Sequence, residues 1–282
     1  MIHPKFSNIL IDWYKENKRD LPWRKTTDPY KIWVSEIILQ QTRVAQGVGY
    51  YNRFIEAFPD VESLAQAPID EVLRLWQGLG YYSRARNLHA AAKEVVLSGG
   101  VFPTTYNELI KRKGVGAYTA AAVASFSSGE AVPVIDGNVK RVLARYHRVE
   151  GWPGKTAVRN RLWEIAERYT PTARCADYTQ AMMDLGATLC TRSKPACELC
   201  PLSGDCEAYA AGDPLAYPGK KPKKSLPVKS THFLILRNGK GNIWLEKRPS
   251  TGIWGGLWCF PEVSSAEAAA AHCLDRWQSG PA

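Results

Sequence analysis

Hydrophobic residues recur every three or four positions through most of the chain up to about residue 215. After Asp28-Pro29, a typical helix start, positions 34, 37, 38 and 41 follow this spacing. Further helices are predicted at 61–77, 84–97, 105–112, 117–127, 138–146, 156–168 and 176–189. Runs that alternate apolar and polar residues are scarce here, so the pattern predicts an all-α domain.

The pattern changes after Tyr217. Residues 218–229 contain three prolines and five lysines, which is typical of an extended linker. The alternating runs 232–237 and 243–248 flank Asn238-Gly239 and predict a β-hairpin, and 266–271 predicts a short helix. We therefore expect a second domain of about fifty residues, cut off before a full core can form.

The composition is that of a folded protein with an excess of basic residues. The 282 residues fit one large domain or two unequal ones. Hydrophobic residues at 45%, charged residues at 23% and a mean hydropathy of -0.29 indicate a globular rather than a disordered chain, and no stretch reaches the roughly eighteen uncharged apolar residues that a membrane span needs. The first residues lack a secretory signal, so we expect a cytoplasmic protein. The net charge of +10 favours a polyanionic partner, and residues 218–282 carry +6 of it.

Four of the seven cysteines are grouped in the spacing Cys190-x6-Cys197-x2-Cys200-x5-Cys206. Four thiolates within seventeen residues can close around tetrahedral zinc or a [4Fe–4S] cluster, and the spacing alone does not choose between them. The other three are expected to be small buried hydrophobic residues. They are Cys175, Cys259 and Cys273.

The segment Gly114-Val115-Gly116 follows three cations, Lys111-Arg112-Lys113, and precedes an alanine-rich helix. Glycines between two helices let the backbone approach a phosphate, and the N–H groups that begin the second helix point at the anion. The pattern is typical of a helix-hairpin-helix. The alternative is a glycine turn between packed helices with no ligand.

Two acidic residues have ordinary structural interpretations. Asp136 ends an apolar run and precedes Gly137-Asn138, which is typical of a helix N-cap. On a helical wheel, Glu36 points away from the face shared by Val34 and Ile38, which predicts solvent exposure. Neither pattern by itself predicts catalysis.

Five motifs and the four cysteines occur in an order that resembles the MutY-type adenine DNA glycosylases, a branch of the endonuclease III-like helix-hairpin-helix superfamily. The resemblance covers essentially all of residues 5–215. The motifs are Leu21-Pro22-Trp23-Arg24, Trp33–Thr42, Gly78–Arg86, Ile135–Arg141 and Gln180–Gly186.

The resemblance implies a mainly α, two-lobed helix-hairpin-helix glycosylase fold with a [4Fe–4S] cluster. One lobe would comprise 1–27 and 133–217, and a six-helix module would comprise 28–132. The linker 218–229 would lead to the truncated start of a Nudix-like α/β domain at 230–282. The cluster ligands would be Cys190, Cys197, Cys200 and Cys206.

The implied reaction is excision of adenine mispaired with 8-oxoguanine or guanine in double-stranded DNA, by a monomeric enzyme. Glu36 would protonate N7 of a flipped adenine, and Asp136, assisted by Asn138, would stabilise the sugar cation. The pocket would be lined by Arg19, Leu21, Trp23 and Arg24. Gln41 and Tyr81 would enter the DNA helix, and the backbone of Gly114, Val115 and Gly116 would contact phosphates.

Tyr118 separates two reaction classes. Lyase members of the superfamily place a nucleophilic lysine two residues after the second hairpin glycine, and this chain has Tyr118 there. We therefore expect base removal without efficient strand cleavage. The alternatives are a bifunctional endonuclease III-like enzyme and a non-catalytic iron–sulfur DNA-binding protein.

The chain departs from the family at the hairpin and in the C-terminal domain. Arg112-Lys113 stands where Leu-Pro is usual. Trp244–Pro249 and Gly252–Glu262 resemble a Nudix-like domain, but no Nudix metal box follows. We expect no pyrophosphatase activity and weak discrimination of 8-oxoguanine from guanine. A structural cluster that holds Arg192 and Lys194 against DNA is favoured over a redox role.

Overall fold

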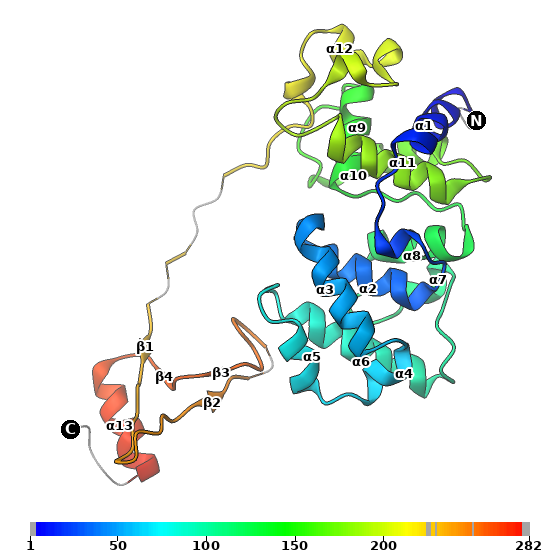
Figure 1. Ribbon diagram of the computed structural model, residues 1–282. Helices are drawn as coiled ribbons and strands as arrows, with labels where there is room; N and C mark the ends of the chain where they lie inside the picture. The colour runs from blue at the N-terminus through cyan, green and yellow to red at the C-terminus, as the bar shows by residue number, and fades with distance from the viewer. Residues whose placement is uncertain (1–3, 224–226, 229, 250, 278–282) are drawn as a thin grey trace. The chain divides into compact units, whose positions relative to one another are not determined.

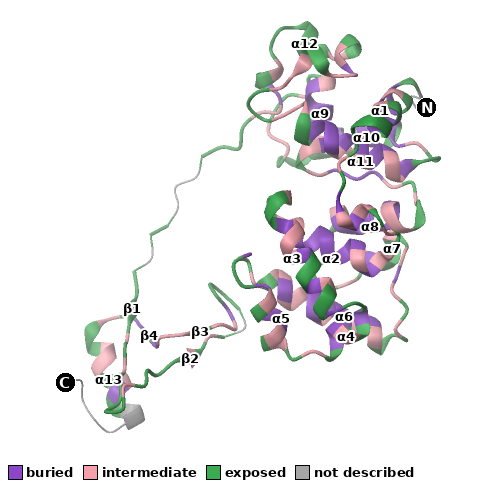
Figure 2. Ribbon diagram, in the orientation of Figure 1, coloured by how far each residue is buried: buried purple, intermediate pink, exposed green. Residues whose placement is uncertain are grey.

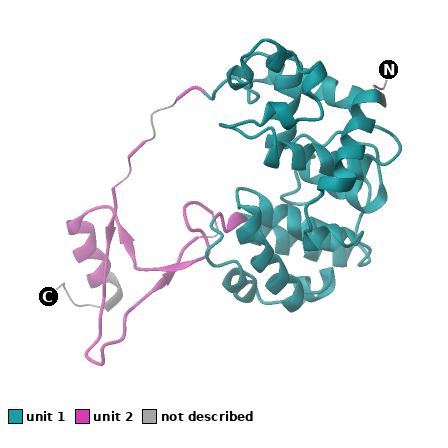
Figure 3. Ribbon diagram, turned by 45° about the horizontal axis from the view of Figure 1, so that its top comes forward, with its two compact units in different colours: residues 1–80, 84–221 teal, residues 81–83, 222–282 magenta. Residues whose placement is uncertain are grey.

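The structure is a computed structural model that describes residues 4–223, 227–228, 230–249 and 251–277. The chain forms two compact units, residues 1–80 with 84–221 and residues 81–83 with 222–282 (Figure 3). Lys224, Ser225, Leu226 and Lys229 of the predicted linker lie outside the described residues. No helix in the described part of the chain is long and apolar enough to cross a membrane.

The larger unit is helical, as the hydrophobic spacing predicts (Figure 1). Its α-helices are α1 Pro4–Asn17, α2 Pro29–Leu39, α3 Val44–Ala57, α4 Val61–Gln66, α5 Ile69–Leu75, α6 Ser83–Leu97, α7 Tyr106–Leu109, α8 Ala117–Ser128, α9 Gly137–Tyr146, α10 Thr156–Tyr169, α11 Cys175–Thr188 and α12 Glu207–Ala210. Its short 3₁₀ helices are η1 Pro22–Arg24, η2 Cys197–Leu199, η3 Ser203–Asp205 and η4 Pro214–Ala216.

Helix α2 lies at the centre of its half of the unit. Its first turn is capped by Asp28, whose carboxylate accepts hydrogen bonds from the N–H groups of Tyr30 and Lys31. The helix packs against α3 and α8, and Figure 2 shows it almost entirely in the colour of buried residues. Because neighbours cover both of its faces, Glu36 is buried, and the solvent exposure predicted from the helical wheel is wrong.

Two predictions from the sequence pattern near α2 differ from the structure. The single helix predicted at 61–77 is two helices, α4 and α5. Ala67 adopts extended backbone because the ring of Pro68 disfavours a helical residue before it. Helix α3 was not predicted.

A second core joins the start of the chain to its later part. Side chains of α1, α9, α10 and α11 form it, including Phe6, Leu143 and Leu185. Gly186 of α11 faces Asn138 of α9 so closely that a Cβ at Gly186 would lie 2.5 Å from the Asn138 Cβ. The glycine therefore lets these two helices approach where Asn138 must be placed.

In its described residues, the smaller unit holds four two-residue strands and one helix. In it β1 His232–Phe233 pairs with β4 Glu262–Val263, β2 Glu246–Lys247 pairs with β3 Trp258–Cys259, and α13 is Ala266–Trp277. The predicted hairpin is present near its turn, where Arg237 and Ile243 form a bridge, the N–H of Trp244 donates to the carbonyl of Leu236 and the N–H of Asn238 donates to that of Asn242. The side chain of Asn238 accepts from the N–H groups of Lys240 and Asn242 in the turn. The regular strands of 232–237 and 243–248 pair with later segments.

Candidate active site and iron–sulfur site

One cavity of the larger unit collects most of the predicted catalytic residues. It measures about 770 Å³ including its opening to solvent. Its walls come from η1, α2, α8, the start of α9 and α11. They include Arg19, Leu21, Trp23, Arg24, Glu36, Tyr118, Asp136 and Asn138, and also Ile32, Ser35, Leu39, Thr42, Val44, Phe126, Gln180 and Met183, which the sequence analysis did not assign to the site.

Glu36 is a buried acid of this cavity. It is 5% exposed, and the hydroxyl of Tyr118 donates a hydrogen bond of 2.5 Å to its Oε2. Burial raises the pKa of Glu36 from 4.5 to about 7, and the negative charge of Asp136 adds to the rise. The Tyr118 hydrogen bond and the charge of Arg24 oppose it. A protonated Glu36 is therefore populated near neutral pH.

Tyr118 lies in the first turn of α8, two residues after Gly116. Burial raises the pKa of its phenol well above 10, and the nearby charges of Glu36 and Asp136 act in the same direction. The hydroxyl therefore stays protonated and donates to Glu36 throughout the neutral range. The site has a hydrogen-bond donor where a lyase would need an amine.

Asp136 is both the N-cap of α9 and a wall of the cavity. Its Oδ1 accepts from the N–H of Val139 at 2.6 Å, and its Oδ2 accepts from the side-chain amide of Asn138 at 2.8 Å. Burial raises the pKa of Asp136, while these hydrogen bonds and the charge of Arg141 oppose the rise. The assistance of Asn138 that was expected from the sequence takes the form of this hydrogen bond.

Asp184 of α11 holds two pocket arginines. Its fully buried carboxylate accepts two hydrogen bonds from Arg24, at 2.6 and 2.7 Å, and one of 2.6 Å from Nε of Arg19. Burial alone would raise the pKa of Asp184, but the hydrogen bonds and charges of the arginines hold it below 3.8. Asp184 lies in the Gln180–Gly186 motif, but its role was not predicted from the sequence. Its spacing from Gln180, one helical turn, was the available signal.

Gln41 and Tyr81, and the hairpin residues Gly114 to Gly116, do not line the cavity. The side chains of Gln41 and Tyr81 are exposed, and both residues have positive φ, at 61° and 46°. Gly114 has φ of 75°, and a Cβ there would lie 2.6 Å from the Cβ of Asn87, so only glycine fits.

The hairpin turn forms without the usual proline. The N–H of Val115 donates to the carbonyl of Arg112 at 3.1 Å, which closes the turn. Gly116 is the N-cap of α8. Because glycine has no side chain, it does not cap the first N–H groups of that helix. These N–H groups are the ones predicted from the sequence to contact a phosphate.

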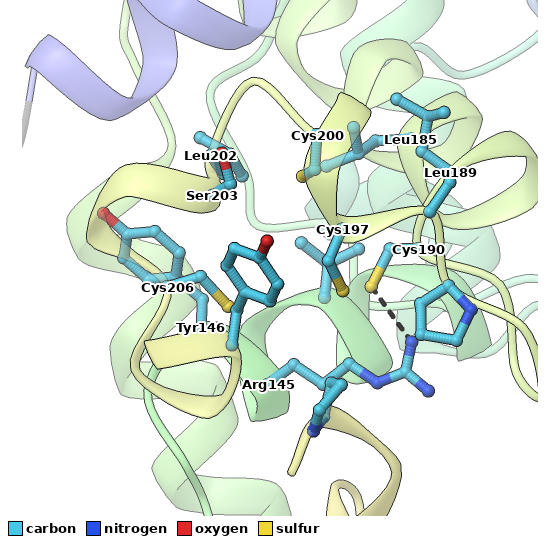
Figure 4. Close-up of a pocket in the computed structure, with 15 residues that line it drawn as sticks. Arg145, Tyr146, Leu185, Leu189, Cys190, Cys197, Cys200, Leu202, Ser203 and Cys206 are labelled. Atoms are coloured by element: carbon cyan, nitrogen blue, oxygen red, sulfur yellow. Dashed lines mark hydrogen bonds between the residues drawn. The ribbon is translucent and has the colours of Figure 1, made fainter. Parts of the chain in front are cut away.

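The four cysteines line a second cavity of about 410 Å³ (Figure 4). In the described residues, no three cysteine, histidine or acidic side chains are close enough together to hold a single metal ion. Four cysteine thiols around one apolar cavity are a donor set that fits an iron–sulfur cluster. Burial raises the pKa of Cys200 to about 11, a backbone hydrogen bond at Leu202 opposes the rise, and the negative charges of the other three cysteines add to it.

Two arginines of α9 contact the segment around Cys190, and one of them also reaches the active-site wall. Arg145 is buried and donates to Sγ of Cys190 at 3.2 Å, as the dashed line in Figure 4 shows. Arg141 donates to the carbonyl of Cys190 at 2.7 Å and to the side-chain oxygen of Asn138 at 2.8 Å. A continuous set of hydrogen bonds therefore runs from the cysteine cavity through Asn138 to Asp136.

Of the remaining cysteines, Cys175 and Cys273 are buried, as predicted. Cys259 is partly exposed and accepts from Arg248 at 3.7 Å.

Three family models match successive parts of the chain. Residues 34–168 match the HhH-GPD superfamily of base excision DNA repair proteins, and residues 190–206 match the iron–sulfur binding domain of endonuclease III. Residues 232–280 match the NUDIX domain. The iron–sulfur match begins and ends at cysteines that line the second cavity, and the cofactor of this protein is a [4Fe–4S] cluster.

Curated relatives and solved structures agree with these matches. A protein of Buchnera aphidicola subsp. Acyrthosiphon pisum, named adenine DNA glycosylase, is 40% identical over 94% of this chain and 76% of its own length. The human adenine DNA glycosylase is 36% identical over 92% of this chain and 57% of its own length.

The structure of a thermostable thymine-DNA glycosylase has a TM-score of 0.68 and 31% identity, over 74% of this chain and 96% of its own. A non-covalent endonuclease III–DNA complex shares the fold, with a TM-score of 0.63 and 20% identity over 74% of this chain and 95% of its own. Together with the paired carboxyl groups and the cysteine cavity, these similarities show that the chain belongs to the adenine DNA glycosylase family of the HhH-GPD superfamily.

Proposed function

We propose that this protein hydrolyses the N-glycosidic bond of adenine mispaired with 8-oxoguanine or guanine in double-stranded DNA. The proposal rests on one observation: Glu36 and Asp136 line the same cavity, and the pKa of Glu36 is raised to about 7. An acid with this pKa can hold a proton at neutral pH and still give it up.

The cavity is suited to a base taken out of the duplex. An enzyme cannot reach the glycosidic bond of a stacked base, so the adenosine is extruded at a cost of a few kcal/mol. Leu21 lines the cavity with an apolar side chain and Trp23 lines it with an aromatic one. The rings of Trp23 and Tyr51 pack edge to face. Exposed Gln41 and Tyr81 fill the gap left in the stack, which offsets part of the extrusion cost.

Glu36 acts first as a general acid. It donates its proton to N7 of adenine, so the base leaves as a neutral molecule. The Tyr118 hydroxyl then stabilises the Glu36 carboxylate, which is the base that activates the attacking water. Asp136 stabilises the positive charge that develops on the sugar, and Asn138 holds its Oδ2 in place.

Two further parts of the larger unit bind the DNA and brace the site. The backbone at Gly114, Val115 and Gly116 contacts phosphates. Cys190, Cys197, Cys200 and Cys206 hold the [4Fe–4S] cluster, which when bound supplies a rigid anchor for the loop carrying Arg192 and Lys194. The protein acts as a monomer in the cytoplasm, where it meets the DNA of the nucleoid.

A duplex with a single adenine opposite 8-oxoguanine tests the proposal, with the products divided into alkali-treated and untreated halves. We expect strand breaks after alkali only, because the site has no amine nucleophile. Parallel duplexes with guanine in place of 8-oxoguanine measure the discrimination between the two partners. Arg74→Lys, a change to an exposed arginine of α5, is the matched control variant.

Each outcome decides between the candidate functions. Absence of adenine release by the protein with its cluster intact contradicts the proposal and favours a non-catalytic DNA-binding role. Breaks without alkali, together with a borohydride-trapped adduct formed at the rate of base release, favour the bifunctional alternative.

A further inference from the structure

Arg84, in the first turn of α6, binds two separate segments with one guanidinium. Its Nη1 donates to the carbonyls of Ile37 and Ile38 at 3.0 and 3.1 Å, and also to the carbonyl of Gln40. Its Nη2 donates to the carbonyls of Leu79 and Gly80 at 3.1 and 3.3 Å. The side chain thus joins the end of α2 to the loop that follows α5.

The carbonyls that Arg84 binds need a partner. The last four carbonyls of an α-helix have no N–H of their own helix to accept from, and a cation at that end also meets the negative end of the helix dipole. On the other segment, Gly80 accepts a second hydrogen bond, of 3.1 Å, from the indole of Trp76. The guanidinium carbon lies 5.2 Å from the centre of that indole, so the aromatic ring supports the guanidinium.

The next residue of each segment is one that the proposed function places in the DNA. Gln41 follows the bound carbonyl of Gln40, and Tyr81 follows that of Gly80. Both have positive φ, which is costly for residues with a Cβ and persists only where the surroundings hold it. Arg84 binds the carbonyl immediately before each of these two unfavourable conformations.

We propose that Arg84 is a positioning residue that holds the backbones of Gln41 and Tyr81 in the conformation with which they enter the DNA helix. This assignment rests on the proposed function, since it concerns the extrusion of the adenosine. Glu36 lies on the same helix, one turn before Gln40, so Arg84 also keeps the entering residue in register with the proposed acid. A lysine cannot replace it, because its single ammonium group cannot span five carbonyls with a planar fork.

The variant Arg84→Lys tests the assignment, with Arg74→Lys as the control. Base release is measured under single-turnover conditions on the adenine:8-oxoguanine duplex. Extrusion is followed by the fluorescence of 2-aminopurine in place of the adenine. We expect Arg84→Lys to lower base release about ten- to a hundredfold and the 2-aminopurine signal with it. The midpoint of its pH profile should stay near that of the parent, because Glu36 is unchanged.

A double-mutant comparison separates positioning from general damage to the fold. In the background Gln41→Ala/Tyr81→Ala, Arg84→Lys should cause less than a threefold further loss, because the groups it positions are already gone. An undiminished loss in that background overturns the assignment. Arg84→Gln, assayed below the melting temperature of each variant, provides the same comparison if the lysine variant does not fold.

The two proposals fail in different ways. Adenine release by the parent protein together with equal release and fluorescence by Arg84→Lys overturns only the role of Arg84. Absence of adenine release by the parent overturns the proposed function and the role of Arg84 with it.

Discussion

The hydroxyl of Tyr118 donates to Oε2 of Glu36 across 2.5 Å, and the two residues lie 82 positions apart in the chain. This hydrogen bond stabilises the carboxylate form, whereas burial favours the protonated form. Because burial is the larger effect, the pKa of Glu36 settles at about 7. The first predictions concern this balance.

Base release should depend on the protonation of Glu36. At low substrate concentration kcat/KM reports the free protein, so it should fall about tenfold per unit above a midpoint near 7, where Glu36 loses its proton, and should also fall at acidic pH, where Asp136 gains one. Measurement of kcat/KM between pH 5 and 9 on the adenine:8-oxoguanine duplex checks this. A midpoint near 4.5, the ordinary value for glutamate, contradicts the role of a buried acid.

Tyr118→Phe should move that midpoint to higher pH. The variant removes the donor that stabilises the Glu36 carboxylate, while the ring that packs in the cavity is retained. The comparison is the kcat/KM profile of the variant against that of the parent, and an unchanged or lower midpoint shows that the hydroxyl does not act on Glu36.

Glu36→Gln should stabilise the fold above pH 7. Since the folded pKa of about 7 is above the unfolded value of 4.5, the folded state holds the proton more tightly, and its stability falls as pH rises from 4.5 to 7. At pH 8 the free energy of unfolding of the parent protein is therefore about 3 kcal/mol lower than it would be with a neutral side chain at position 36, and at pH 4 it is not lowered. Urea unfolding at these two pH values checks the difference. A Glu36→Gln variant that is equally stable at both, relative to the parent, contradicts it.

Asp136→Asn should separate catalysis from stability. Asparagine can keep the N-cap bond from Val139, but its amide nitrogen cannot accept from Asn138. Because removal of a buried charge offsets part of that loss, the free energy of unfolding should change by less than about 2 kcal/mol. Loss of the negative charge beside the sugar should lower base release by about 10²- to 10³-fold. Single-turnover rates and thermal melting of the same preparation measure both effects. A variant that keeps the parent rate shows that Asp136 is only a cap.

Asp184→Asn should lower both the rate of base release and the stability of the fold. It leaves Arg19 and Arg24 partly buried without their counter-charge, which typically destabilises by about 3–5 kcal/mol. Asp177→Asn is the matched control on the same helix, because its ion pair with Arg174 is exposed and worth less than about 1 kcal/mol.

The pH dependence of the parent tests the same ion pairs. The folded pKa of Asp184 is below 3.8, so the stabilisation is present above that value and is lost as the pH falls through the folded pKa. Urea unfolding of the two variants and the parent at pH 7 and pH 3 distinguishes the two sites. Equal effects of the two substitutions contradict the buried network.

The sequence by itself determined those features that depend on residues close together in the chain. Helix spacing predicted α8 to α11 nearly to their ends, and Asp28-Pro29 marked the start of α2, since caps and apolar periodicity are local. The cysteine spacing limited the second site to zinc or a [4Fe–4S] cluster. The order of the motifs indicated the family.

Only the tertiary structure decided features that depend on what a helix packs against. A helical wheel placed Glu36 in solvent, but α3 and α8 cover both faces of its helix, and that burial is what raises its pKa. The binding of Arg24 by Asp184 joins residues 160 positions apart, and no local pattern contains that information. Desolvation and long-range hydrogen bonds arise only when separate segments meet, so the chemistry of this site follows from the folded arrangement of residues that the chain supplies one motif at a time.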